Sequence, residues 1–197
     1  MEYNRGNIDK LFHEIVQAKE IAIEEIPCID LYMDQVTTFF EDKLSNSKRN
    51  PEDKILTKTM INNYTKGKIL MPAKKKKYTT EHMILLILIY NLKQGLSIND
   101  INTLFNSIFD EKTEEIKKNV HIDEVYKSFL RIKTKGNEEL ENNFNTMIET
   151  IEEELINLQG EEKDLIQVFI TVLVLIDRAN SYRRTAEKVI DNFVKDW

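Results

Sequence analysis

The sequence has few of the residues from which catalytic and metal sites are usually built. It contains one cysteine, Cys28, and three histidines, His13, His82 and His121, which lie far apart along the chain. A single cysteine excludes a disulfide within this chain and cannot supply a zinc site, and it suits a reducing compartment. No glycine-rich phosphate loop, nucleophile elbow or His-x-x-x-His motif occurs. We therefore expect a cytoplasmic protein that is not an enzyme and that has no metal and no cofactor.

Long hydrophobic runs are also missing. No stretch of 18 or more apolar residues occurs, and the two densest runs are residues 83–92 and 165–176. The N-terminus lacks the basic-then-apolar layout of a signal peptide. We expect no membrane span, and we expect both runs to be buried helices. The second run, residues 165–176, is hydrophobic on nearly every side. Such a helix is buried in the centre of a bundle or across a subunit interface.

Only five glycines and three prolines interrupt 197 residues, and apolar residues recur at helical rather than strand spacing. The fold class predicted is all-α. Caps and breakers place the ends of the helices, with Pro27 ending the first and Asp30, either Thr57 or Thr59, Thr80 and Ser97 as N-caps. Glycines 136 and 160 mark two joints. The helices expected cover residues 8–26, 30–44, 57–66, 81–94, 98–109, 111–119, 122–133, 138–158, 162–180 and 182–196.

The charge is distributed unevenly. The formal net charge is −6, yet residues 54–80 carry eight lysines and no carboxylate, which leaves 20 basic and 34 acidic residues elsewhere, a balance of −14. This asymmetry is typical of a protein with one polyanion-binding face and an acidic body.

The helix predicted over residues 57–66 has two different faces. At about 100° per residue, Met60, Ile61 and Tyr64 share one side and can pack on a core. The other side holds two lysines, two asparagines and a threonine, with no carboxylate. Asparagine can bond the major-groove edge of adenine, threonine can contact a base, and lysine contacts phosphate or guanine. The run Lys74–Lys77 follows Pro72, and we expect it to form a short wing against a phosphate backbone.

Residues 60–105 resemble the winged helix-turn-helix of the MerR family of transcription regulators. The matching segments are Tyr64, the turn at residues 69–72, the lysine run, residues 78–81 and residues 95–101, read as Tyr-Thr-Thr-Glu and Gly-Leu-Ser-Ile-Asn-Asp-Ile. The Arg-Tyr-Tyr of that family is Asn62-Asn63-Tyr64 here, so Tyr64 alone carries over, for phosphate contact or helix packing. The chain from residue 29 onward also resembles an uncharacterised bacterial domain family of unknown function, found mainly in Gram-positive genomes.

These observations predict a DNA-binding transcriptional regulator. Residues 1–28 would form an N-terminal helix, residues 29–109 the MerR-like helix-turn-helix, and residues 110–197 a helical effector or dimerisation region. We expect a homodimer on double-stranded DNA, joined through the C-terminal half, and any effector would be a small molecule. The DNA-binding residues predicted are Lys58, Thr59, Asn62, Asn63, Tyr64, Lys66, Lys68, Lys74, Lys75, Lys76, Lys77 and Tyr78.

Two alternatives remain open. The basic segment could instead dock on an acidic protein partner, or on the acidic part of this chain, as a non-enzymatic interaction module. Single-stranded RNA binding is less favoured, because it needs exposed aromatic side chains for stacking. We expect no functional role for most of the histidines and the cysteine. The histidines are expected at the surface, where His82 could also contact a phosphate. Cys28 is expected to be a small buried side chain.

Overall fold

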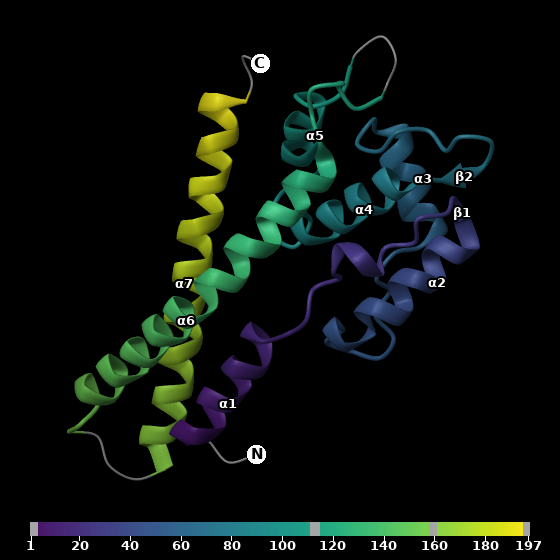
Figure 1. Ribbon diagram of the computed structural model, residues 1–197. Helices are drawn as coiled ribbons and strands as arrows, with labels where there is room; N and C mark the ends of the chain where they lie inside the picture. Colours follow the sequence, from purple (N-terminus) through teal and green to yellow (C-terminus); the bar gives the residue numbers. More distant parts are fainter. Residues whose placement is uncertain (1–3, 111–114, 158–160, 195–197) are drawn as a thin grey trace. The chain divides into compact units, whose positions relative to one another are not determined.

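The computed structural model describes residues 4–110, 115–157 and 161–194. It forms two compact units: unit 1 is Met1–Glu20 with Phe129–Arg184, and unit 2 is Ile21–Ser128 with Thr185–Trp197. This division differs from the predicted boundaries after residues 28 and 109. The elements in chain order are α1 (Arg5–Val16), η1 (Ile23–Glu25), β1 (Leu31–Tyr32), α2 (Met33–Leu44), η2 (Ser45–Ser47), α3 (Lys58–Lys66), β2 (Lys77–Tyr78), α4 (Thr80–Leu92), α5 (Ile98–Asn106), α6 (Ile122–Glu154) and α7 (Glu161–Phe193) (Figure 1). The all-α prediction is confirmed, since the strands of the described residues are two residues long.

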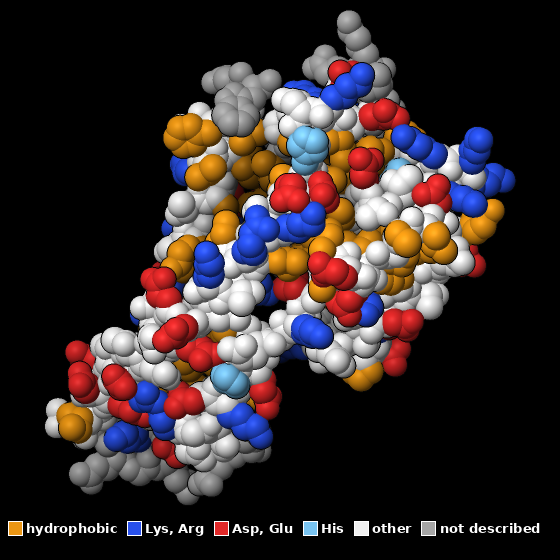
Figure 2. Space-filling view, in the orientation of Figure 1, with side chains coloured by type: hydrophobic (Ala, Val, Ile, Leu, Met, Phe, Trp, Pro, Cys, Tyr) orange, Lys and Arg blue, Asp and Glu red, His pale blue; other side chains and the backbone are white. Residues whose placement is uncertain are grey.

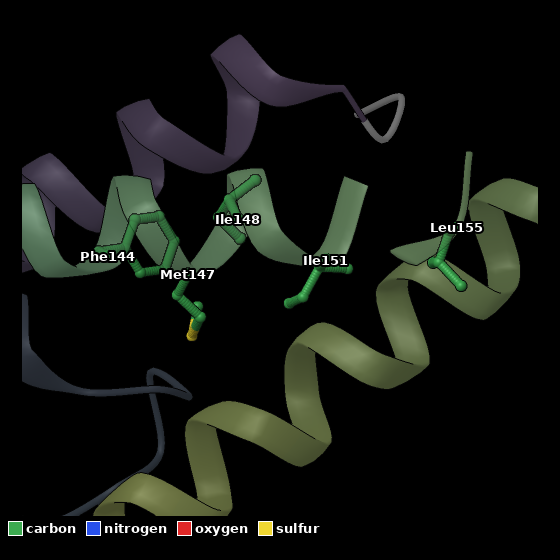
Figure 3. Packing of buried hydrophobic residues seen from close by; sticks show 5 residues of the cluster. All are labelled: Phe144, Met147, Ile148, Ile151 and Leu155. Carbon is green, nitrogen blue, oxygen red and sulfur yellow. The ribbon is translucent and has the colours of Figure 1, made fainter. Parts of the chain in front are cut away.

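Unit 1 is built from α1 and parts of the two long helices. Its core is an apolar cluster on α6 and the residue that follows it, shown in Figure 3, against which Ile8 and Phe12 of α1 and Ile170 and Val174 of α7 pack. The rings of Phe12 and Phe144 stack with centroids 3.8 Å apart. Arg5 also links α1 to α6, through ion pairs with Glu149 and Glu152 at 3.3 and 3.1 Å. The buried cluster consists of Phe144, Met147, Ile148, Ile151 and Leu155.

The first helix is shorter than predicted. The prediction of a helix over residues 8–26 is wrong, because α1 ends at Val16 and only η1 is helical in the next ten residues. The backbone N–H of Gln17 closes the last turn on the carbonyl of His13, and Asn137 donates its side-chain N–H to the carbonyl of Val16 at 3.2 Å. A side chain distant in sequence thus satisfies a helix terminus, which periodicity does not reveal.

The joints predicted in the second half are wrong in two places. Helix α6 runs through Gly136 without a break, and α7 runs through residue 181, where we expected a boundary between two helices. The joint at residue 160, and part of the helix expected over residues 111–119, lie outside the described residues. Residues 115–119 of that expected helix are not helical. A glycine inside a long helix lowers its stability but does not stop it.

The apolar run of α7 is exposed. Eight apolar side chains between Leu165 and Ile176 are 36–71% exposed, whereas Gln167 and Thr171 are buried at 7% and 5%. Within unit 1 this helix therefore does not lie in the centre of a bundle, which is one of the two positions expected for it. By length and composition the span Lys163–Phe193 could cross a membrane, with a mean hydropathy of 1.4 in its most apolar window and 11% of that window buried.

Unit 2 has a compact core around α4. Seven consecutive or near-consecutive residues of α4, from His82 to Ile89, are buried, and none exceeds 1% exposure. Strands β1 and β2 pair antiparallel with Leu31 opposite Tyr78, and β2 also contacts α4. Helix α2 contacts both strands and α3, and it buries Val36 and Phe40 completely.

The predicted caps are confirmed where the cap is local. Thr57 accepts from the N–H of Met60 at the start of α3, and Ser97 accepts from the N–H of Asp100 at the start of α5. Asp30 is not a cap. Instead, residues 31 and 32 form β1 before the helix begins. The N–H of Tyr32 then donates to the side chain of Gln35 at the start of α2. Helix α4 begins one residue before the prediction, with Thr79 at its N-cap.

The connection between α2 and α3 is long. It covers residues 45–57 and contains η2, whereas a helix-turn-helix usually joins its helices by three or four residues. The two helices nevertheless contact each other. Unit 2 therefore places α3 against α2 by packing rather than by a tight turn.

Candidate nucleic-acid interface

Helix α3 presents the polar face that the sequence predicts. Ile61 is fully buried and Tyr64 is 7% exposed, so this side of α3 packs into unit 2. The opposite face is exposed and carries no carboxylate. It consists of Lys58, Thr59, Asn62, Asn63 and Lys66.

The end of α3 is fixed by an unusual residue. Gly67 donates to the carbonyl of Asn63 at 2.8 Å, and the N–H groups of Ile69 and Leu70 both donate to Tyr64, at 2.9 and 3.2 Å. This pattern needs a left-handed residue after the helix, a position that glycine usually fills. Here Lys68 adopts it, with φ of 59°. The chain leaves α3 through an exposed lysine rather than through Gly67.

The lysine run forms a tight two-residue turn. Lys74 and Lys77 exchange two backbone hydrogen bonds of 3.0 Å, and Lys75 and Lys76 between them have φ of 53° and 66°. Positive φ at both central residues is the mark of a type I′ turn, in which Asn-Gly is favoured. The exposed tip of this turn therefore consists of two lysines, at the place where the sequence predicts a short wing. Figure 2 shows Lys and Arg side chains gathered at the edge of unit 2 around β2.

Backbone strain is concentrated in this basic segment. Within the described residues, the non-glycine positions with positive φ are Lys68, Lys75 and Lys76. A left-handed residue with a long side chain costs on the order of 1–3 kcal/mol. Strain of this kind persists where the surrounding structure holds it, and it is typical of functional segments.

Two lysines of the wing already have partners. Lys74 forms an ion pair with Glu115 at 2.8 Å, and the ammonium of Lys77 lies 5.2 Å from the ring centroid of Tyr32. The hydrogen bond between Lys74 and Glu115 raises the pKa of the lysine and lowers the pKa of the carboxyl. Both side chains of that pair are more than half exposed, so the pair adds little stability. Lys75 and Lys76, at the tip of the turn, are exposed and point their ammonium groups toward solvent.

The two tyrosines predicted to contact DNA lie in the core. Tyr64 and Tyr78 are 7% and 5% exposed, and burial raises the pKa of both phenols. Tyr78 meets His82 edge to face, with centroids 5.5 Å apart. We correct the prediction for these two residues, because their rings pack against unit 2 instead of forming an exposed surface.

His82 is a buried anchor rather than a surface histidine. Its Nδ1 accepts the N–H of Thr79 at 3.1 Å, and its Nε2 lies 3.2 Å from the carbonyl of Pro72. Because Nδ1 accepts, the proton resides on Nε2, which donates to Pro72. Burial lowers the pKa of this imidazole. The histidine therefore ties the turn that precedes the wing to the start of α4, and a phosphate contact is excluded by its burial.

The structure corrects one further assignment. Cys28 is exposed, so the expectation of a small buried side chain is wrong. His13 and His121 are exposed, as expected, and His13 lies 2.9 Å from Glu141 of α6.

Sequence reasoning missed both Glu115 and the role of His82. Glu115 is 41 residues from Lys74, and no sequence signal pairs them. His82 had a signal, since Thr79-x-x-His82 has the spacing of a capping box with histidine in place of glutamate.

A hollow lies beside the C-terminal end of α3. Its volume is about 400 Å³, within the range of ligand pockets. Its walls combine apolar, amide and charged side chains. They are Thr65, Lys68, Leu70, Met71, Pro72, Asn106, Phe109 and Asp110.

Comparison with known families assigns the chain. Residues 21–129 match a family described as Domain of unknown function (DUF1836), and the chain belongs to this family. The match covers most of unit 2 and thus all the residues of the basic segment. Comparisons with curated proteins and with solved structures found no match.

Proposed function

We propose that this protein is a DNA-binding transcriptional regulator in which residues 29–109 act as a MerR-like winged helix-turn-helix. The observation that carries the proposal is the exposed, carboxylate-free face of α3, followed in the same unit by a strained turn with two lysines at its tip. A face needed only for solubility would mix carboxylates with lysines, as the rest of the chain does. The strain of Lys75 and Lys76 also needs a reason, because glycine would relieve it.

In the proposed complex α3 enters the major groove. Asn62 and Asn63 read base edges, with adenine as the preferred partner, and Thr59 contacts a base or phosphate. Lys58 and Lys66 flank the groove, while Lys75 and Lys76 hold the phosphate backbone. The protein binds as a homodimer joined through its C-terminal half, which pairs two half-sites.

The salt dependence follows from the number of phosphate contacts. Of the seven lysines predicted to bind DNA, Lys68, Lys74 and Lys77 have interactions within the chain, which leaves four principal contacts, Lys58, Lys66, Lys75 and Lys76. Each contact contributes about −0.9 to the slope of log K against log salt, so the slope expected is roughly −3 to −4 per protomer.

The test replaces both wing-tip lysines by glycine, as Lys75→Gly with Lys76→Gly. Glycine keeps the left-handed turn, so the fold is retained and gains about 1 kcal/mol by relief of strain. Binding to genomic DNA fragments should weaken, and the salt slope should flatten by about 2. Titrations by fluorescence anisotropy at several salt concentrations measure both quantities.

A matched control removes two exposed lysines from unit 1, as Lys19→Gln with Lys135→Gln. The net charge changes equally, but the slope should not change. An unchanged slope in the wing variant, or an equal loss in the control, contradicts the assignment of the wing.

The competing function is docking on an acidic protein. The ion pair between Lys74 and Glu115 favours it, since it shows one wing lysine engaged by a carboxylate. Asn62→Ala with Asn63→Ala separates the two functions. A DNA reader loses discrimination between sequences, whereas a charge-docked complex is almost unaffected, because no charge is removed.

For a small-molecule effector we propose the hollow beside α3. A ligand bound between residues 65–72 and 106–110 would contact the turn that joins α3 to the wing. Thr65→Trp, which fills the hollow from its α3 side, should leave DNA binding intact and abolish any effect of metabolite extracts on the DNA affinity.

A further inference from the structure

The hollow beside α3 has one wall that the end of α3 holds in place. This wall comes from residues 65–72, in which Lys68 is the left-handed residue that follows the helix. The N–H groups of Ile69 and Leu70 both donate to the carbonyl of Tyr64, so the backbone of this wall is fixed by the chain itself. The shape of the wall therefore does not depend on a ligand.

The other wall comes from the end of α5 and the residues that follow it. The N–H of Asp110 donates to the carbonyl of Glu115 at 2.8 Å, and the N–H of Lys117 donates to the carbonyl of Ile108 at 2.9 Å. The ammonium of Lys117 also donates to the carbonyl of Ser107 at 2.9 Å. Both walls of the hollow are thus formed in advance, as is usual for a small-molecule site.

The base of the hollow is apolar. Leu70, Met71 and Phe109 line it, although they are only 1%, 4% and 8% exposed. Because these side chains are almost fully buried, the surface that they present to the hollow lies deep in it. A ligand with an apolar group placed there would remove apolar surface from water on both molecules.

The rim of the hollow is polar and carries one charge of each sign among the described residues that line it. Lys68 is exposed and contributes an ammonium from one wall, and the half-buried Asp110 contributes a carboxylate from the other. Both also interact with other groups of the chain. The exposed amide of Asn106 can donate or accept. The hydroxyl of Thr65 donates to the carbonyl of Ile61 at 3.2 Å, which leaves its oxygen able to accept.

We propose that this hollow binds a zwitterionic α-amino acid with a large apolar side chain. The proposal names the chemical class of the effector in the proposed function, and it rests on that part and not on the DNA contacts. Lys68 binds the carboxylate of the ligand, Asp110 binds its ammonium, and its side chain lies on Met71 and Phe109. The volume of about 400 Å³ is near the lower end of the range for ligand pockets, which suits a molecule of this size.

Other classes of small molecule match this rim less well. A nucleotide or a sugar phosphate carries a dianion, which the single ammonium of Lys68 does not neutralise and which the carboxylate of Asp110 repels. A carboxylate without an amine gains nothing from Asp110, and an amine without a carboxylate gains nothing from Lys68. A zwitterion uses both charges.

The first test is isothermal titration calorimetry of the full chain without DNA. The probes are free phenylalanine, tryptophan, leucine and methionine, and glycine is the comparison that lacks an apolar side chain. At least one of the four should bind, and glycine should not. Absence of binding by all four at up to about 10 mM, where a site with a Kd of about 1 mM is nearly saturated, overturns the proposal.

The two charges of the ligand are tested with analogues on the unaltered protein, so that folding of a variant does not enter. The amino acid that binds most tightly is compared with its des-amino and decarboxylated analogues, which for phenylalanine are phenylpropanoate and phenethylamine. Each should bind at least about tenfold more weakly, because each has lost a charge-assisted hydrogen bond. An analogue that binds as tightly as the amino acid contradicts recognition of a zwitterion.

Two variants assign these charges to residues. Lys68→Asn removes the ammonium but keeps a residue that tolerates the left-handed conformation. It should weaken the amino acid about tenfold and leave the decarboxylated analogue unchanged. Asp110→Asn should weaken the amino acid similarly and leave the des-amino analogue unchanged.

The matched controls are Lys118→Asn and Asp42→Asn, which remove exposed charges of unit 2 outside the hollow. They should change the affinity for neither the amino acid nor its analogues. Circular dichroism checks that all four variants remain folded. Equal effects in the hollow variants and in the controls overturn the proposal.

The place of binding is tested by NMR of protein labelled on its methionine methyl groups. The chain has six methionines, and Met71 lines the hollow. Its signal, assigned with Met71→Leu, should shift most when the amino acid binds, and Thr65→Trp should abolish binding. A shift confined to another methionine would place the amino acid elsewhere and overturn the proposal.

DNA binding is measured separately on the same proteins, which keeps the two proposals distinct. A chain that binds the amino acid but no DNA contradicts the proposed regulator and leaves the ligand of the hollow assigned. A chain that binds DNA but none of the amino acids contradicts the ligand class and leaves the DNA interface unaffected.

Discussion

Helices α4 and α7 contain the two most apolar runs of the chain, yet their environments are opposite. In α4, side chains from Met83 to Leu86 are at most 1% exposed. In α7, Leu165 and Phe169 are 71% and 65% exposed. Both runs lack the polar face of a surface helix. The difference is that α4 is enclosed by the other elements of unit 2, whereas within unit 1 α7 has the α6 cluster on one side only.

Hydrophobicity along the sequence predicts that a helix must be covered, but it does not predict which part of the protein covers it. A run that is apolar on every side is expected to be buried in the functional state. For α4 the cover belongs to the same chain. For α7 the described residues of unit 1 supply only part of it, on the side that packs against the α6 cluster.

The largest expected effect comes from shortening one leucine in each helix. Leu85→Ala in α4 removes a fully buried side chain and should lower the free energy of unfolding by about 2–5 kcal/mol. Leu173→Ala in α7 removes a side chain that is 53% exposed, so the loss should be below about 0.5 kcal/mol. Urea unfolding followed by circular dichroism measures both. Comparable losses would show that α7 is as well covered as α4.

The same contrast explains which parts of the fold the sequence could predict. The caps of α3 and α5 depend on residues three positions apart, so the sequence predicts Ser97 for α5 and either Thr57 or Thr59 for α3, of which Thr57 is the cap. The end of α1 depends on Asn137, and the start of α2 depends on β1 pairing with β2, both remote in sequence. Apolar periodicity continues beyond Val16 although the helix does not. Contacts between distant segments decide such cases.

The second prediction concerns the buried polar residue of α4. His82 is neutral in the fold because burial lowers its pKa, whereas an unfolded histidine titrates near 6.5. The unfolded state therefore binds the proton more readily as the pH falls. Stability should be constant above about pH 6.5 and should fall below it, by up to about 1.4 kcal/mol per pH unit.

The measurement is urea unfolding at pH 7.5, 6.0 and 5.0. His82→Gln keeps an acceptor for the N–H of Thr79 and has no titration in this range, so its stability should vary less between these pH values. His13→Gln, which changes an exposed histidine, should keep the pH dependence of the wild type. If His82→Gln and the wild type lose stability equally, His82 is not the responsible group.

The candidate interface was predictable to a similar degree. The exposed face of α3 follows from one helix and its period, and Lys58, Asn62 and Asn63 lie where the wheel places them. The wing was predicted from a lysine run, but its turn type was not, because two lysines are poor residues for positive φ. Tyr78 is buried because β2 pairs with β1. A strand of two residues is too short to show an alternating pattern, so this burial could not be predicted from the sequence.

The smallest expected effect tests how much intrinsic helix propensity stabilises the long helices of unit 1, which have much exposed surface. A helix with a well-buried face is held by packing, but one with much exposed surface depends more on intrinsic propensity. Gly136→Ala should therefore stabilise α6 by about 0.5–1 kcal/mol, since a Cβ there meets no atom within 4 Å. Gly67→Ala is the matched control, because its Cβ would lie 3.2 Å from the carbonyl of Asn63 and should give no gain. Thermal unfolding measures both, and a loss of stability in Gly136→Ala would indicate that α6 needs a glycine hinge at this position after all.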